Sequence, residues 1–90
     1  MPETMIALTI YSKPGCHLCD DMKAIVDRVV RTSGLSIGIE HVDITTDPDL
    51  EARYGLEIPV LLVEGTKIAK YRVTEAELRR ALRARAGEAG

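Results

Sequence analysis

The chain has two cysteines, Cys16 and Cys19, in the segment YSKPGCHLC at residues 11–19. A pair at this spacing can exchange electrons as a dithiol and a disulfide, or can supply half of a zinc site. Exchange needs a thiolate near neutral pH, because the thiolate is the species that attacks a disulfide. The surrounding sequence must therefore stabilise negative charge on one of the two sulfur atoms.

Three features favour a thiolate at Cys16. The residue falls where a turn meets a predicted helix, and there free backbone N–H groups and the helix dipole favour an anion. Cys19 follows one helical turn later and can donate a hydrogen bond to the Cys16 sulfur or close a disulfide with it. Lys13 can approach from the preceding loop. We expect these features to lower the pKa of Cys16 from about 8.5 into the range of roughly 3.5–7.5. Cys16 would then attack a substrate disulfide, and Cys19 would resolve the mixed disulfide.

Other polar residues near the pair allow more than one interpretation. An imidazolium at His17 can stabilise the thiolate, or His17 can be a solvated residue of the first helical turn. Asp20 and Asp21 complement the helix dipole in the simplest interpretation. His41 belongs to a distant strand, where a structural or surface role is the simpler expectation.

Three alternatives to redox chemistry stay open. A zinc site needs four ligands, and without a second cysteine pair it would have to recruit His17 or His41, so we expect no metal site within the chain. A dimer can share an iron–sulfur cluster through Cys16. The two thiols can also be inert buried groups in an interaction domain without catalysis.

The elements that must position the pair follow from the spacing of apolar residues. The predicted order is β-α-β-α-β-β-α, in the α/β class. A helical crossover makes the first two strands parallel, and a hairpin completes a mixed four-stranded sheet. The strands are expected at about 5–11, 37–44, 59–63 and 67–71, and the helices at about 16–33, 46–54 and 74–85. Residues 86–90 are expected to be a frayed tail of a single domain, 1–90, with its core at about 5–85.

The segment YSKPGCHLC, its helix and the later Ile58-Pro59 before a strand resemble glutaredoxins and the wider thioredoxin fold. The similarity extends from Met5 to about Leu82. The resemblance implies that Cys16 is the nucleophile and Cys19 the resolving thiol. It also implies that Pro59 is a cis-proline that faces the pair and exposes the backbone of Ile58 to an extended substrate. Further candidates for thiolate stabilisation or substrate binding are Tyr11, Lys13, His17 and Lys70.

The sequence departs from glutaredoxins in three places. His-Leu separates the cysteines instead of the usual Pro-aromatic pair, so the redox potential does not carry over. The Gly-Gly that approaches glutathione is replaced within IAKYRVT at residues 68–74. We therefore expect no tightly bound cofactor, with glutathione only a candidate reductant that lacks its usual site. The Ser-Gly-Phe-type C-terminal signature is also absent, and the remaining pattern is similar to short-chain glutaredoxin-like proteins.

Composition narrows the choice of partners. A net charge of −2 and the absence of Phe and Trp give no basic, base-stacking surface for nucleic acid. The start of the chain, MPETMIALTI, has no basic region before its apolar run, so we expect no signal peptide and no membrane association. We predict a cytoplasmic monomer that reduces protein or small-molecule disulfides as a thiol–disulfide oxidoreductase.

Charge is unevenly distributed along the second half of the chain. Seven acids and one base occupy residues 40–64, whereas seven bases and two acids occupy residues 67–85. We predict that Lys67, Lys70 and Arg72 lie at the edge of the site and select an acidic partner.

Overall fold

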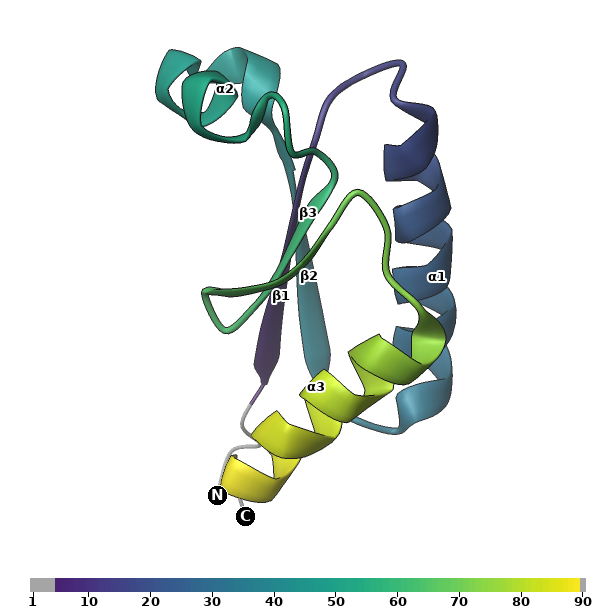
Figure 1. Ribbon diagram of the computed structural model, residues 1–90. Coiled ribbons are helices and arrows are strands. Elements are labelled where there is room, and N and C mark those ends of the chain that lie inside the picture. Colours follow the sequence, from purple (N-terminus) through teal and green to yellow (C-terminus); the bar gives the residue numbers. More distant parts are fainter. Residues whose placement is uncertain (1–4, 90) are drawn as a thin grey trace.

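A mixed four-stranded sheet with helices along one side and beyond one end forms the fold (Figure 1). The computed structural model describes the backbone of residues 5–89 and the side chains of residues 5–86. The strands are β1 (Ile6–Ser12), β2 (Ile37–Asp43), β3 (Val60–Val63) and β4 (Thr66–Lys70), and the helices are α1 (His17–Ser33), α2 (Pro48–Tyr54) and α3 (Glu75–Ala89). A short 3₁₀ turn, Ile44–Thr46, precedes α2. The element order and the α/β class confirm the prediction.

The strand order in the sheet is β2-β1-β3-β4. β1 is parallel to β2 and antiparallel to β3, and β4 is antiparallel to β3. The predicted parallel crossover and the predicted hairpin are both present. The carboxyl end of β1 therefore leads directly into the loop that carries Cys16.

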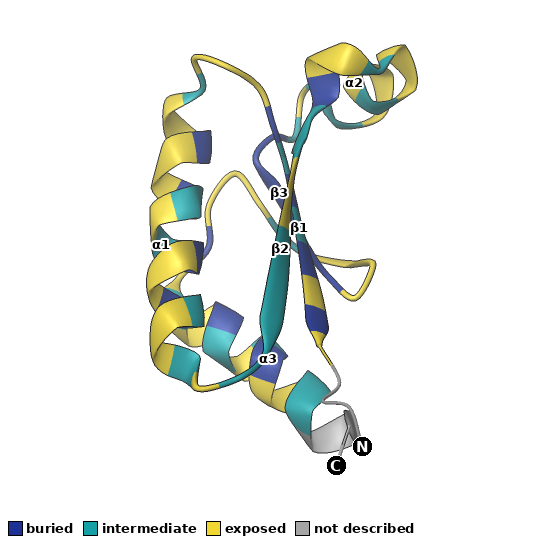
Figure 2. Cartoon of the chain, turned by 180° about the vertical axis from the view of Figure 1, so that it is seen from behind, coloured by how far each residue is buried: buried dark blue, intermediate teal, exposed yellow. Residues whose placement is uncertain are grey.

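Helix α1 is amphipathic and packs one face on the sheet. Met22, Val26 and Val29 recur at helical spacing and are buried, whereas the opposite face is exposed (Figure 2). Cys16 is the N-cap residue, and Gly34 ends the helix in the left-handed conformation, with φ of 74°. The cap places the first cysteine at the positive end of the longest helix.

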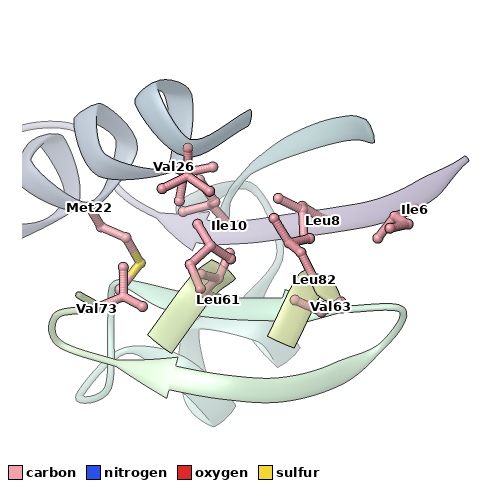
Figure 3. Packing of buried hydrophobic residues seen from close by; sticks show 11 residues of the cluster. Ile6, Leu8, Ile10, Met22, Val26, Leu61, Val63, Val73 and Leu82 are labelled. Carbon is pink, nitrogen blue, oxygen red and sulfur yellow. The ribbon is translucent and has the colours of Figure 1, made fainter. Parts of the chain in front are cut away.

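The main core lies between the sheet and the helices α1 and α3 (Figures 1 and 3). Alternate residues of β1 enter it, as expected for a strand with one buried face. All four residues of β3 are buried. The buried cluster comprises Ile6, Leu8, Ile10, Met22, Val26, Val29, Leu61, Val63, Val73, Leu78 and Leu82. This packing fixes the start of α1 relative to the end of β1.

The second strand ends at Asp43, one residue before the predicted end. The Asp43 carboxylate accepts hydrogen bonds from the backbone N–H of Thr45, at 2.9 Å, and from the Thr45 hydroxyl, at 2.6 Å. These two hydrogen bonds lower the pKa of Asp43, and the bond from the hydroxyl contributes more than the bond from the backbone. The side chain thus caps the 3₁₀ turn and stops the strand.

The sequence allows either Thr46 or Asp47 to cap the start of helix α2. Asp47, rather than Thr46, is the N-cap residue, and its carboxylate accepts a hydrogen bond from the Asp49 N–H at 2.9 Å. Pro48 occupies the first turn, where its missing N–H costs nothing.

Two predicted boundaries near the C-terminus were wrong. β4 ends at Lys70, because Tyr71 adopts a left-handed backbone conformation with φ of 71°, which a strand does not accommodate. Helix α3 continues to Ala89, so the tail that was expected to fray from residue 86 is helical as far as the described backbone extends. Residues 86–89 are Ala-Gly-Glu-Ala, in which the alanines and the glutamate are good helix formers and the glycine is not.

The N-terminus of α3 is held by a reciprocal capping box. The Thr74 hydroxyl accepts from the Glu77 N–H at 3.1 Å, and the Glu77 carboxylate accepts from the Thr74 N–H at 2.9 Å. Two hydrogen bonds from Thr74 lower the pKa of Glu77, and the bond from the backbone N–H contributes more than the bond from the hydroxyl. The contribution of this carboxylate to stability is therefore present at neutral pH and is lost as the pH falls through its lowered pKa.

Replacing Thr74 by alanine should lower the free energy of unfolding by about 1 kcal/mol, because the cap hydroxyl is lost. Urea denaturation of the wild type and of Thr74→Ala measures the difference. Thr74→Ser keeps the hydroxyl and should retain most of the stability. Equal losses in both variants would contradict this role of the hydroxyl.

Candidate active site

The two cysteines form a disulfide at the N-terminus of α1, with their Cα atoms 5.2 Å apart. Cys19 is fully buried, whereas Cys16 is only partly buried. The backbone N–H of Cys19 donates a hydrogen bond to the Cys16 sulfur at 3.1 Å. The fold thus exposes one sulfur of the pair, gives it a backbone donor and shields the other.

An apolar cluster surrounds the pair at the carboxyl end of β1. Cys19 is buried in it together with Ile44 and Ile58. Tyr11, Cys16, Leu50 and Tyr54 pack against this cluster. Segments from β1, the 3₁₀ turn, α2 and the loop before β3 therefore meet at the disulfide.

The loop before β3 has the geometry that the resemblance implies. The Ile58–Pro59 peptide bond is cis, and Pro59 is fully buried. The Ile58 N–H, however, donates to the Tyr54 carbonyl at 3.1 Å. This donor is thus paired within the chain, and pairing of the Ile58 backbone with an extended substrate stays a prediction.

Comparison with known proteins agrees with this geometry. Residues 7–83 match the family model of the glutaredoxin-like domain (DUF836). The chain belongs to this glutaredoxin-like family. A search of curated proteins found no match.

Solved structures resemble the glutaredoxin-like chain over most of its length. The structural-genomics target protein XcR50 from X. campestris is 30% identical, with a TM-score of 0.70, and the alignment covers 86% of this chain and 96% of that one. Protein Ne2328 from Nitrosomonas europaea is 26% identical, with a TM-score of 0.68 and coverage of 84% and 89%. Thioredoxin-2, a component of the malaria parasite protein secretion machinery, is 19% identical, with a TM-score of 0.66 and coverage of 93% and 85%. The last likeness shows the thioredoxin fold alone, and together these results confirm the predicted fold.

Two aromatic rings stack beside the disulfide of the glutaredoxin-like domain. The ring centroids of Tyr11 and Tyr54 are 4.5 Å apart, and the ring planes are inclined by 16°. Tyr11 was a candidate from the sequence, whereas Tyr54 was assigned only to the end of a helix. Tyr54 is one of only three aromatic residues in the chain, and this scarcity is the only feature of the sequence that could have indicated a role for it at the site.

The predicted charged neighbours of Cys16 are solvent-exposed. The His17 side chain is 89% exposed, and its Nε2 lies 3.7 Å from an Asp21 carboxylate oxygen. This placement favours the solvated interpretation of His17. Lys13 is exposed and lines a pocket of about 220 Å³ together with Asp20, Lys23, His41 and Asp43. His41 is exposed on β2, as expected for a surface role.

One of the three basic residues predicted to select an acidic partner, Lys67, is already paired within the domain. The Lys67 ammonium lies 2.9 Å from the Glu57 carboxylate. Their hydrogen bond is the main cause of the lowered pKa of Glu57 and of the raised pKa of Lys67. The Lys70 ammonium lies 5.5 Å from the centre of the Tyr71 ring, a cation–π arrangement. The charge of Lys67 is thus compensated within the domain.

Among the residues that the structure describes, no group of three or more His, Cys, Asp or Glu side chains is arranged to hold a metal ion. The helices within that part of the chain include none that is long and apolar enough to cross a membrane.

Proposed function

We propose that this glutaredoxin-like domain is a dithiol thiol–disulfide oxidoreductase. The observation that supports this most directly is the difference between its two sulfur atoms. Cys16 is partly exposed, caps α1 and accepts a backbone hydrogen bond at 3.1 Å, whereas Cys19 is fully buried. A helix N-terminus and a backbone donor stabilise a thiolate, and apolar burial disfavours one. The exposed position is therefore suited to attack and the buried position to resolution.

The reaction transfers two electrons in two exchanges. The Cys16 thiolate attacks one sulfur of the substrate disulfide, so a Cys16–substrate bond forms and the other substrate sulfur leaves as a thiolate. Cys19 loses its proton and attacks the Cys16 sulfur, which releases the second substrate thiolate. The domain is left with the Cys16–Cys19 disulfide. The Cα separation of 5.2 Å lies within the range of about 4.4–6.8 Å that a disulfide spans.

A thiol or dithiol donor must then reduce the domain. In glutaredoxin-like sequences with Gly-Gly at this place, the backbone can approach glutathione closely, but Ala69 and Lys70 stand here. Lys70 pairs with Val60 in the hairpin, and the exposed side chains of Tyr71 and Arg72 follow it. We propose that a dithiol protein, rather than tightly bound glutathione, supplies the electrons in the cytoplasm. Equilibration of the domain against glutathione and, separately, against a dithiol protein would test this predicted donor.

The stoichiometry of a single turnover tests the proposed function. The pre-reduced domain, mixed with an excess of an aromatic disulfide, should release two aromatic thiols per chain, because both exchanges proceed. Cys19→Ser should release one, and Cys16→Ser should react slower by about three orders of magnitude or more. Circular dichroism of each variant controls for folding. Release by Cys16→Ser at the wild-type rate would contradict the proposal.

A further inference from the structure

Large apolar side chains are exposed at four positions of the described chain: Met5, Leu18, Leu56 and Tyr71. Leu18 lies between the two cysteines. The Tyr71 N–H donates to the carbonyl of Pro59 at 2.8 Å, and its hydroxyl donates to the carbonyl of Leu56 at 3.1 Å. Leu18 thus lies in the first turn of α1, Leu56 lies in the loop before the cis-proline, and Tyr71 is hydrogen-bonded to that loop. Met5 precedes β1, at the opposite end of that strand.

Leu18 and Tyr71 line one groove of about 490 Å³ between α1 and the segment after β4. Figure 1 shows that segment, in green, running beside α1 before α3 begins. The side chains of Ile25 and Val73 also line the groove, and Asp21 and Arg72 contribute its charged groups. The groove thus begins at the residue between the cysteines and offers an apolar lining large enough for side chains of a peptide.

The carboxylates near Lys70 and Arg72 have other polar partners. Glu57 pairs with Lys67, Glu77 is hydrogen-bonded in the capping box of α3, and Asp21 lies 3.7 Å from His17. Within the part of the chain that the structure describes, no ion pair includes Lys70 or Arg72. Arg72 lines the apolar groove and also, with Lys70, a neighbouring hollow on the outer side of β4. Two cations therefore remain to meet a negative group of a partner.

The position of Cys16 restricts what can occupy the groove. A substrate sulfur bonded to Cys16 brings the flanking residues of the substrate next to Leu18, because Leu18 is two positions further along, in the first turn of α1. A glycine or a polar residue there would leave the apolar lining in water. A large apolar residue would cover it, and the free energy of binding would gain roughly what such a side chain gains on leaving water.

From this juxtaposition we infer that the substrate is a protein disulfide whose reactive cysteine adjoins a large apolar residue, with a carboxylate close by. The apolar side chain occupies the groove between Leu18 and Tyr71, and the carboxylate meets Lys70 or Arg72. This inference rests on the proposed oxidoreductase function and names the substrate class of that same site. It makes small, polar disulfides such as that of glutathione poorer substrates.

The test uses the Cys19→Ser variant of the full chain, which stops after the first exchange. Peptides are prepared with one cysteine in a disulfide with a chromogenic aromatic thiol. Attack of Cys16 on the peptide sulfur forms the Cys16–peptide disulfide and releases the chromophore as a thiolate. Four peptides combine Leu or Gly next to the cysteine with Asp or Lys two positions further on. Glutathione with the same leaving group is the fifth substrate.

We expect the Leu peptides to react at least about fivefold faster than the Gly peptides. Asp should be favoured over Lys at low salt, and this preference should shrink at high salt. Adding Leu18→Ser should reduce the preference for Leu to less than about twofold, whereas Met5→Ser, an exposed apolar residue outside the groove, should leave it unchanged.

Each other outcome decides against the inference. Equal rates for Leu and Gly peptides, or a faster reaction with the glutathione substrate, overturn it while leaving the oxidoreductase function in place, because the chromophore is still released. Release from none of the five substrates removes both the inference and the proposed function.

Discussion

Iodoacetamide will modify Cys16 of the reduced domain at least about a hundred times faster than Cys19. Alkylation requires a thiolate that the reagent can reach. Cys16 is partly exposed at the N-terminus of α1 and has the Cys19 N–H as a hydrogen-bond donor, 3.1 Å away in the disulfide form. Cys19 is fully buried against Ile44 and Ile58. Accessibility and charge stabilisation therefore act in the same direction, and this is the largest difference that we expect at the site.

Fragmentation mass spectrometry locates the label after short exposures to the reagent. The same protein unfolded in denaturant is the control, since the two cysteines should then react at rates within a few-fold of each other. Equal rates in the folded, reduced protein would show that the environment does not distinguish the two sulfur atoms. The assignment of nucleophile and resolving thiol would then lose its physical basis.

Leu61→Ala should lower the free energy of unfolding by about 2–5 kcal/mol. Leu61 lies in β3, one of the two interior strands of the sheet, is 0% exposed and belongs to the cluster that joins the sheet to α1 and α3. Removing its side chain loses apolar burial and leaves a cavity that the surrounding strands cannot fully close. A small domain has only about 5–15 kcal/mol of stability in total, so this variant should unfold at a much lower urea concentration.

The chain supplies a matched control for that measurement. Leu56→Ala makes the same chemical change at a side chain that is 92% exposed. Its urea midpoint should stay close to that of the wild type, because an exposed leucine loses little on truncation. If both variants lost stability equally, Leu61 would not be part of a packed core as the structure places it.

Local patterns in the sequence were sufficient to predict most of the fold. The helical spacing of Met22, Val26 and Val29, the glycine after α1 and the Thr74–Glu77 box each depend on residues within a few positions. Their physical causes are local, and the structure has them where the sequence indicates. The exact ends of β2 and β4 depend instead on one side-chain cap and one positive φ, which the spacing of apolar residues does not encode.

The cysteine pair and the cis-proline were also accessible from the sequence, because each carries a compact motif. The stacking of Tyr54 on Tyr11 was not, since the two rings are 43 positions apart and meet only through packing at the end of β1. The same reason applies to Lys67, which was predicted to be available to a partner but pairs with Glu57 in the loop before β3. The hydrogen bond from Ile58 to Tyr54 likewise depends on how the chain leaves α2.

The central claim is that Cys16 makes the covalent bond to the substrate and Cys19 releases it. The direct measurement is to mix reduced Cys19→Ser and reduced Cys16→Ser separately with a disulfide-containing protein and to locate any adduct by mass spectrometry. We predict a stable mixed disulfide through Cys16 in the first variant, reversible by an added dithiol, and no comparable adduct through Cys19 in the second. An adduct that forms through Cys19, or no adduct at Cys16 with any disulfide offered, would contradict the account.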